Sequence, residues 1–202
     1  MRVLIIGSGG REHAFAHAIR QSDRLSALFV APGNAGILQL ADSAPLDVAD
    51  HSAVGHFCEA ERIDLVIVGP EAPLVDGLAD SLRARGVAVL GPSQAAAELE
   101  GSKAFVKQLA FANDVPTADS QTHDQVDTAL AALDDFALPV VVKADGLAAG
   151  KGVIIAETKA QAEDAVRACF DGAFGAAGSR VVIEEFLSGE EISCFALCDG
   201  TD

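Results

Sequence analysis

The sequence predicts an α/β protein in which an open parallel sheet comes first and a smaller α+β unit follows. The first observation is a series of short apolar runs of strand length, at 3–6, 27–31, 65–68 and 87–90. Continuous apolar runs are typical of strands that are buried on both faces of a parallel sheet. The second observation is that helical segments separate most of these runs, at about 11–20, 72–85 and 94–112. This alternation indicates an open α/β sheet.

The third observation is a change of pattern after about residue 115. We expect strands at 138–144 and 152–157, a helix at 158–171, and further strands at 180–187 and 191–197. Only a glycine-rich loop separates the first two of these strands, so they form an antiparallel pair in an α+β unit. We place the boundary between the units near 99–103, where Gly101 breaks a helix and Ser102 can cap the next one.

Composition excludes several classes of protein. Half of the 202 residues are hydrophobic, so the chain can bury a core, and 30 acidic against 14 basic residues give a net charge of −16. That charge argues against a general binder of nucleic acid or of anionic membranes. No apolar run approaches the roughly 20 residues that span a bilayer. The four cysteines include no CxxC pair, so we expect no zinc site. Since no signal peptide is visible either, we expect a soluble cytoplasmic protein with reduced thiols.

The ends of three predicted parallel strands are rich in Gly, Pro, Asn and Glu. They read GSGGREH at 7–13, APGNAG at 31–36 and GPEAP at 69–73. Ligands of open α/β sheets gather at the carboxyl ends of the strands, so these loops predict a binding site.

The first of these loops does not fit a dinucleotide site. Gly7 and Gly9 match G-x-G-x-x-G, but Glu12 takes the place of the third glycine, and the second strand ends without an acidic residue. A phosphorylated sugar at the helix N-terminus remains chemically sensible. A zinc site at Glu12, His13 and His17 is rejected, because the spacing differs from H-E-x-x-H.

The glycine-rich loop of the second unit, in VVKADGLAAGKGVII (141–155), is not a P-loop. Only three residues separate Gly146 from Gly150, Gly152 follows Lys151 where Ser or Thr is needed, and a strand follows instead of a helix. Such a loop between antiparallel strands can instead cover a triphosphate, with Lys143 on the strand below it. A plain glycine-rich hairpin with surface lysines is the alternative.

The segment VVIEEFLSGEE (181–191) favours nucleotide binding. A strand that ends at EEFL exposes backbone groups to an adenine edge, and Glu191 can reach ribose hydroxyls. Four acidic residues within eight would repel one another on a purely structural strand. A solvated strand edge is the alternative.

Together these motifs resemble the glycinamide ribonucleotide synthetase family of ATP-grasp ligases. The resemblance runs through nearly the whole chain: GSGGREHA, PGNAG, GPEAPLVDGLAD, LEGSKAFVK, VVKADGLAAGKGV and VIEEFLSGEE occur in the family's order. It implies a Rossmann-like pre-ATP-grasp domain at 1–101, a connection at 102–120, an ATP-grasp lid at 121–190, and the start of a truncated central ATP-grasp domain at 191–202.

The resemblance also implies two sets of binding residues and no catalytic side chain. The ATP contacts would be Lys103, Lys143, Gly146, Gly150, Lys151, Gly152, Glu184, Glu185, Leu187 and Glu191. The phosphoribosylamine contacts would be Gly9, Gly10, Glu12, His13, Asn34 and Glu71. The implied metal is Mg²⁺ or Mn²⁺, and no residue of this chain is assigned to it.

The implied reaction joins glycine to 5-phosphoribosylamine at the expense of ATP, through a glycyl phosphate, in purine biosynthesis. Family members are about twice as long, and most of the central ATP-grasp domain is absent here. We therefore expect an amino-terminal portion that is inactive alone and exposes apolar surface that favours self-association, whereas the full-length enzyme would be a monomer. The competing hypotheses are a stand-alone ATP-binding module without catalysis, and a related ATP-grasp ligase or carboxylase of the same pathway.

Overall fold

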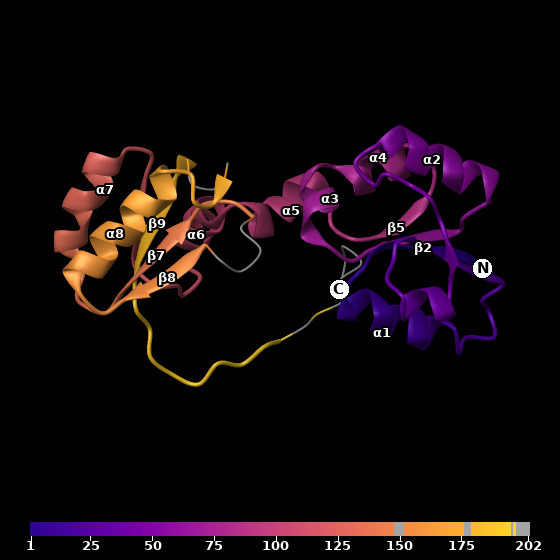
Figure 1. Ribbon diagram of the computed structural model, residues 1–202, viewed down its shortest axis with the longest axis horizontal. Coiled ribbons are helices and arrows are strands. Elements are labelled where there is room, and N and C mark those ends of the chain that lie inside the picture. The colour runs from indigo at the N-terminus through magenta and orange to yellow at the C-terminus, as the bar shows by residue number, and fades with distance from the viewer. Residues whose placement is uncertain (148–151, 176–178, 195, 197–202) are drawn as a thin grey trace.

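The computed structural model describes residues 1–147, 152–175, 179–194 and 196. Figure 1 shows two sheets, each with its own helices, and the helices α5 (Gln94–Gly101) and α6 (Lys103–Ala112) between them. The predicted combination of an α/β unit and an α+β unit is confirmed. In the described part of the chain, no helix is long and apolar enough to cross a membrane.

The first sheet is open and entirely parallel, as predicted. Its strands are β1 (Arg2–Gly7), β2 (Ala27–Pro32), β3 (Asp42–Ser43), β4 (Leu65–Val68) and β5 (Ala88–Leu90), in the order β3-β2-β1-β4-β5. The central strand β1 contributes the fully buried residues Leu4, Ile5 and Ile6. Their burial on both faces explains why the sequence of β1 does not alternate between apolar and polar residues.

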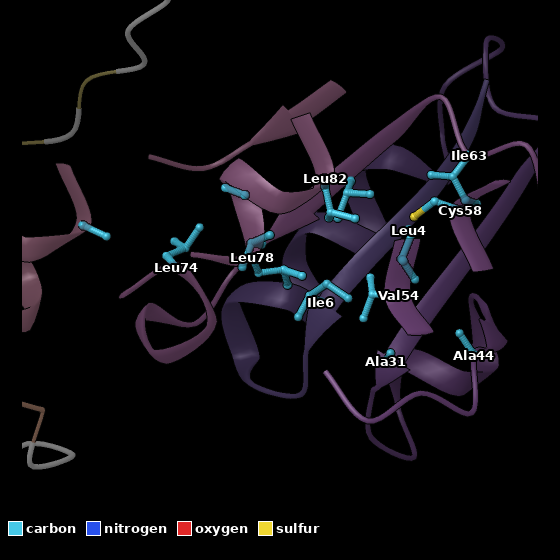
Figure 2. Close-up of a cluster of buried hydrophobic side chains, with 14 residues drawn as sticks. Leu4, Ile6, Ala31, Ala44, Val54, Cys58, Ile63, Leu74, Leu78 and Leu82 are labelled. Atoms are coloured by element: carbon cyan, nitrogen blue, oxygen red, sulfur yellow. The ribbon is translucent and has the colours of Figure 1, made fainter. Parts of the chain in front are cut away.

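Helices cover both faces of this sheet. Leu4 and Ile6 pack with α2 (His51–Ala60) and α4 (Leu78–Ala84) on one face, through residues such as Val54 and Leu82 (Figure 2). On the other face, Ile5 packs with Ala16 of α1 (Gly10–Ile19) and with the 3₁₀ turn Ile37–Gln39. Two separate apolar clusters therefore fix the two faces of the sheet.

The predicted helix at 72–85 is wrong as a single element. The structure has α3 (Glu71–Val75) and α4, separated by Gly77 at φ +93°, a left-handed conformation that breaks the helical path. The predicted break at 101–102 is confirmed, because α5 ends at Gly101 and the Ser102 hydroxyl accepts a hydrogen bond from the backbone N–H of Phe105.

The second sheet is antiparallel, with strand order β6-β9-β7-β8. Its strands are β6 (Ser120–His123), β7 (Val140–Ala144), β8 (Val153–Ala156) and β9 (Val181–Glu185). The helices α7 (Val126–Ala132) and α8 (Lys159–Phe170), with the 3₁₀ turn Leu133–Asp135, cover the face that carries Val140, Val142 and Ile183. The antiparallel pairing of the strands on either side of the glycine-rich loop is confirmed.

The predicted strand at 191–197 is wrong for the residues that the structure describes. Residues 191–194 and 196 carry no strand, and the side chain of Ile192 is 84% exposed. A strand needs a neighbour that pairs with its backbone, and the described residues offer none to this segment. The preceding strand also ends at Glu185, two residues earlier than predicted.

Candidate functional site

The predicted substrate loops meet at one edge of the parallel sheet. β1 and β4 are neighbours, and the strand order reverses between them, which is where open α/β sheets bind ligands. A cavity of about 540 Å³ lies at this edge. It is lined by residues of α1 (Arg11 and Phe15), of the segments that follow β4 and β5 (Gly69, Glu71 and Pro92) and of α5 (Glu100).

Glu12 lies beneath these loops and is only 4% exposed. Its Oε2 accepts a hydrogen bond of 2.6 Å from the backbone N–H of Gly9, and its Oε1 accepts one of 3.2 Å from Arg11 Nε. A Cβ atom on Gly69 would lie 1.9 Å from the same Oε1. The Glu12 carboxylate therefore caps α1 and holds two glycine loops together, which is a positioning role.

Asn34 also holds backbone in place. Its Nδ2 donates to the Ser8 carbonyl at 2.7 Å, and its Oδ1 accepts from the backbone N–H of Gly36 at 2.9 Å. The ring of His13 packs against Gly36, where a Cβ atom would lie 2.6 Å from His13 Cε1. Asn34 and His13 thus tie the loop after β2 to the loop after β1.

Arg11 and Glu71 form an ion pair between the first loop and the loop after β4, with Nη2 and Oε1 3.0 Å apart. The pKa of Glu71 is lowered by a hydrogen bond from its own backbone N–H and, next, by the bond from Arg11. Gly10, at the start of α1, has open space where a Cβ atom would stand. All six predicted contacts of the first unit therefore lie on the loops and helix starts at one strand edge.

A second cavity, of about 620 Å³, lies between the two units. The first unit contributes Pro70, Glu71 and Ala72, the helix α5 contributes Leu99 and Glu100, and the second unit contributes Lys103, Gly146, Leu147, Gly152 and Val153. Glu71 and Glu100 line both cavities, so the two spaces adjoin.

The base of the glycine-rich loop is attached to the start of α6. Lys103 Nζ donates to the Gly146 carbonyl at 2.7 Å. The Asp145 carboxylate accepts hydrogen bonds from the backbone N–H of Ala104, at 3.1 Å, and from the Ser102 hydroxyl, at 3.2 Å. Sequence analysis did not single out Asp145, because its partners Ser102, Ala104 and Arg180 stand 35 or more residues away. The predicted residues Gly150 and Lys151 lie outside the described residues.

The face of the second sheet that α7 and α8 leave uncovered carries a compact ionic cluster. Lys143 Nζ lies 2.7 Å from Glu184 Oε2, and Lys107 Nζ lies 3.3 Å from the same oxygen. Val141 and Ile155 are paired on this face, and Lys143 is paired with Val153. Val153 and Ile155 are exposed, so the cluster lies beside apolar surface.

The other predicted nucleotide contacts lie at or beyond the end of β9. The Glu185 side chain points to the face opposite Glu184, and its Oε1 accepts a hydrogen bond from the backbone N–H of Asp119 at 3.1 Å. Leu187 and Glu191 are exposed. Lys107 was missed by sequence analysis, although its spacing of four residues from Lys103 places both on one side of α6.

These features define a class of protein. A parallel sheet with glycine loops at its strand edge, joined to an antiparallel sheet with lysines and a glycine-rich hairpin loop, is the arrangement of ATP-grasp proteins. Family models agree with it: "Phosphoribosylglycinamide synthetase, N domain" matches residues 1–100, and "Phosphoribosylglycinamide synthetase, ATP-grasp (A) domain" matches residues 101–202. The chain therefore belongs to the phosphoribosylglycinamide synthetase family.

Individual relatives agree. The chain is 55% identical over 201 residues to the phosphoribosylamine–glycine ligase of Mesorhizobium japonicum, covering 100% of this chain and 47% of that protein. It is 51% identical over 203 residues to the ligase of the same name from Escherichia coli, covering 99% of this chain and 47% of that protein. The chain thus spans about half the length of these curated relatives.

Solved structures show the same fold. The crystal structure of phosphoribosylamine–glycine ligase from Thermotoga maritima has a TM-score of 0.77 at 29% identity, covering 94% of this chain and 45% of that one. N5-carboxyaminoimidazole ribonucleotide synthetase from Thermus thermophilus has a TM-score of 0.66 at 22% identity, covering 92% of this chain and 47% of that one, and supports the fold alone.

Proposed function

We propose that this chain supplies the lid over ATP and the amine-substrate loops of an enzyme that ligates glycine to 5-phosphoribosylamine. The products would be glycinamide ribonucleotide, ADP and phosphate, in the cytoplasmic synthesis of purines. The observation that carries the proposal is the junction of the two cavities at Glu71 and Glu100. A nucleotide held by the second sheet and a sugar phosphate held by the first would meet there.

The second unit offers what a nucleoside triphosphate requires. Lys103 and Lys143 provide positive charge on either side of the glycine-rich loop, whose described ends are Gly146 and Gly152. The exposed apolar side chains of Val153 and Ile155 offer a surface for the adenine ring. In this arrangement Glu184 and the backbone of Glu185 and Leu187 would meet the base, and Glu191 would meet the ribose.

The first unit suits a small phosphorylated amine. Gly9 and Gly10 leave the backbone at the start of α1 free of side chains, and an anion is favoured there by the helix dipole. Glu12, His13 and Asn34 would act mainly by holding this backbone, and Glu71 would face the substrate from the opposite loop. The phosphate would thus be recognised by backbone and the amine by carboxylate.

The proposed chemistry has two steps. A glycine carboxylate oxygen attacks the γ-phosphorus of ATP, the bond to ADP breaks, and glycyl phosphate forms. The nitrogen of 5-phosphoribosylamine then attacks the acyl carbon, phosphate leaves, and the nitrogen loses a proton. Positioning and charge neutralisation account for such phosphoryl transfer without a nucleophilic side chain. Among the described residues no group of three or more His, Cys, Asp or Glu side chains can hold a metal ion, so we assign no metal ligand.

A stand-alone ATP-binding module is the second candidate, because the chain spans only about half the length of its relatives. Two measurements on the purified chain separate the candidates. Isothermal titration calorimetry with ATP and Mg²⁺ tests binding, and mass spectrometry after addition of glycine and 5-phosphoribosylamine tests for glycinamide ribonucleotide.

We expect the 202-residue chain to bind ATP without forming product, and a longer protein that includes the rest of the family's length to form it. Binding by both proteins with no product from either would favour the module. Absence of ATP binding by the longer protein would overturn the proposal.

A further inference from the structure

Lys107 is a buried cation that none of the proposed contacts uses. It lies on α6, is 8% exposed, and donates hydrogen bonds to the Thr117 hydroxyl at 2.7 Å and to the Ala118 carbonyl at 3.0 Å. Two neutral acceptors do not balance the charge of a buried ammonium group, which is costly without an anionic partner. Glu184 supplies that partner at 3.3 Å.

Glu184 shares one carboxylate oxygen between two lysines. Oε2 lies 2.7 Å from Lys143 Nζ and 3.3 Å from Lys107 Nζ. The Lys107 and Glu184 side chains are 10% and 6% exposed, whereas the Lys143 side chain is 25% exposed. The inner lysine is therefore enclosed with the carboxylate, and the outer lysine is the one that a ligand can reach.

The charge of this cluster follows from a simple count. Two lysines and one glutamate give a net charge of +1, whereas Lys143 and Glu184 alone would form a neutral pair. A neutral pair attracts a polyphosphate weakly, because the carboxylate repels the anion as the ammonium group attracts it. The fixed position of Lys107 thus decides whether Lys143 presents net positive charge.

We infer that Lys107 is a positioning residue of the proposed ATP site, which neutralises Glu184 and so leaves the charge of Lys143 available for the phosphates. This inference rests on the proposed function, because it assigns the outer lysine to a polyphosphate. Lys107 itself need not touch the nucleotide. Its anchors at Thr117 and Ala118 hold it against Glu184 from the side of α6.

The test compares the binding of inorganic tripolyphosphate to three proteins by calorimetry at low salt: the wild-type chain, Lys107→Met and Lys107→Met/Glu184→Gln. Tripolyphosphate is the probe because it has no base that could contact Glu184. We expect Lys107→Met to bind about tenfold more weakly. The double variant removes one charge of each sign and restores the net charge of +1, so it should recover most of that loss.

A purely structural role predicts a different pattern. The double variant would then bind as weakly as Lys107→Met, or more weakly, and that result would overturn the inference. Thr117→Val removes a neutral hydrogen bond from Lys107 but no charge, and should change tripolyphosphate affinity by less than about twofold. Lys159→Met removes a lysine whose exposed partner is Asp134 and controls for total charge.

Folding is followed by circular dichroism and thermal melting for every variant. If Lys107→Met does not fold, Lys107→Gln takes its place, since its amide can still donate to Thr117. Lys107→Arg keeps the charge and should retain affinity. If the wild-type chain does not bind, the variants are compared in the longer protein, and failure of both wild-type proteins to bind ATP and tripolyphosphate would overturn the proposed function and this inference with it. If the wild-type chain binds tripolyphosphate and Lys107→Met binds it with the same affinity, the inference is wrong but the proposed function stands.

Discussion

The edge of the parallel sheet and the face of the antiparallel sheet opposite α7 and α8 use polar side chains in different ways. At the parallel sheet, Glu12 and Asn34 turn inward and bond to backbone, so that they hold the glycine loops at the strand edge in place. On the antiparallel sheet, Lys143 and Glu184 bond to each other, and Lys107 joins them at the same carboxylate oxygen. Changes at the first site should therefore cost stability, and changes at the second should cost affinity.

The largest expected effect is a loss of ATP affinity, without a loss of stability, when Lys143 is replaced. Lys143→Met should weaken ATP binding about 100-fold, or about 2.7 kcal/mol, because the accessible cation is lost. Glu184 keeps Lys107 as its partner, so the melting temperature should change little. Calorimetry and thermal melting measure the two quantities. A fall in melting temperature of more than about 5 °C would mean that Lys143 is also structural.

Gly69→Ala should show the reverse pattern at the parallel sheet. The added methyl group would lie 1.9 Å from Glu12 Oε1 and displace a buried carboxylate, so we expect a loss of about 2 kcal/mol in the free energy of unfolding. Urea denaturation measures this loss. Gly10→Ala is the matched control, since open space surrounds its position and its stability should match wild type. Equal losses in both variants would contradict the role given to Glu12.

Ser102→Ala tests the link between the units. The hydroxyl caps α6 and also donates to Asp145, so its loss should cost about 1 to 1.5 kcal/mol. Ser93 caps α5 in the same way by accepting from Ala96, and among the described residues it has no hydrogen bond to the second unit. Ser93→Ala should therefore cost less in urea denaturation. If the two serine variants lose the same stability, the Asp145 bond contributes nothing measurable.

The smallest expected effect is the pH dependence of the Arg11–Glu71 ion pair. A carboxyl group whose pKa is lowered by folding stabilises the folded state fully above its ordinary value of 4.5, and this contribution is lost as pH falls through the lowered pKa. Both side chains are largely exposed, so the contribution should stay under about 0.5 kcal/mol. Glu71→Gln should therefore be slightly less stable than wild type at pH 7 in urea, and the difference should shrink toward pH 3.

Much of this fold is predictable from local sequence, because its strongest signals are local. Continuous apolar runs such as residues 3–6 predict buried parallel strands, and Ser102 predicts a helix start from its cap. The helix α2 and the strand β6 were not predicted; β6 carries only the polar sequence SQTH. The strand expected at 191–197 fails because pairing depends on a neighbour, which the apolar pattern of one segment does not reveal.

The residues of the candidate site also differ in how far local sequence predicts them. Loop motifs predict the six residues of the first unit and the ends of the glycine-rich loop. The inward orientation of Glu12 has a local signal, its position three residues after the helix cap Gly9. For Lys107 the local signal is only its spacing of four residues from Lys103, because Glu184, which balances its charge, lies 77 residues away in sequence and meets it only in the folded chain.

The position of the Asp145 carboxylate at the N-terminus of α6 has consequences for nucleotide binding and for the connection between the two units. The positive end of this helix is already occupied by a carboxylate from the protein, so an incoming nucleotide would meet lysine side chains there in place of the helix dipole. Asp145 follows directly after β7, and it accepts hydrogen bonds from Ser102 and Ala104 at the start of α6. These bonds connect the antiparallel sheet to α6. A rotation of the antiparallel sheet toward a bound nucleotide would turn α6 with it and bend the chain at its junction with α5.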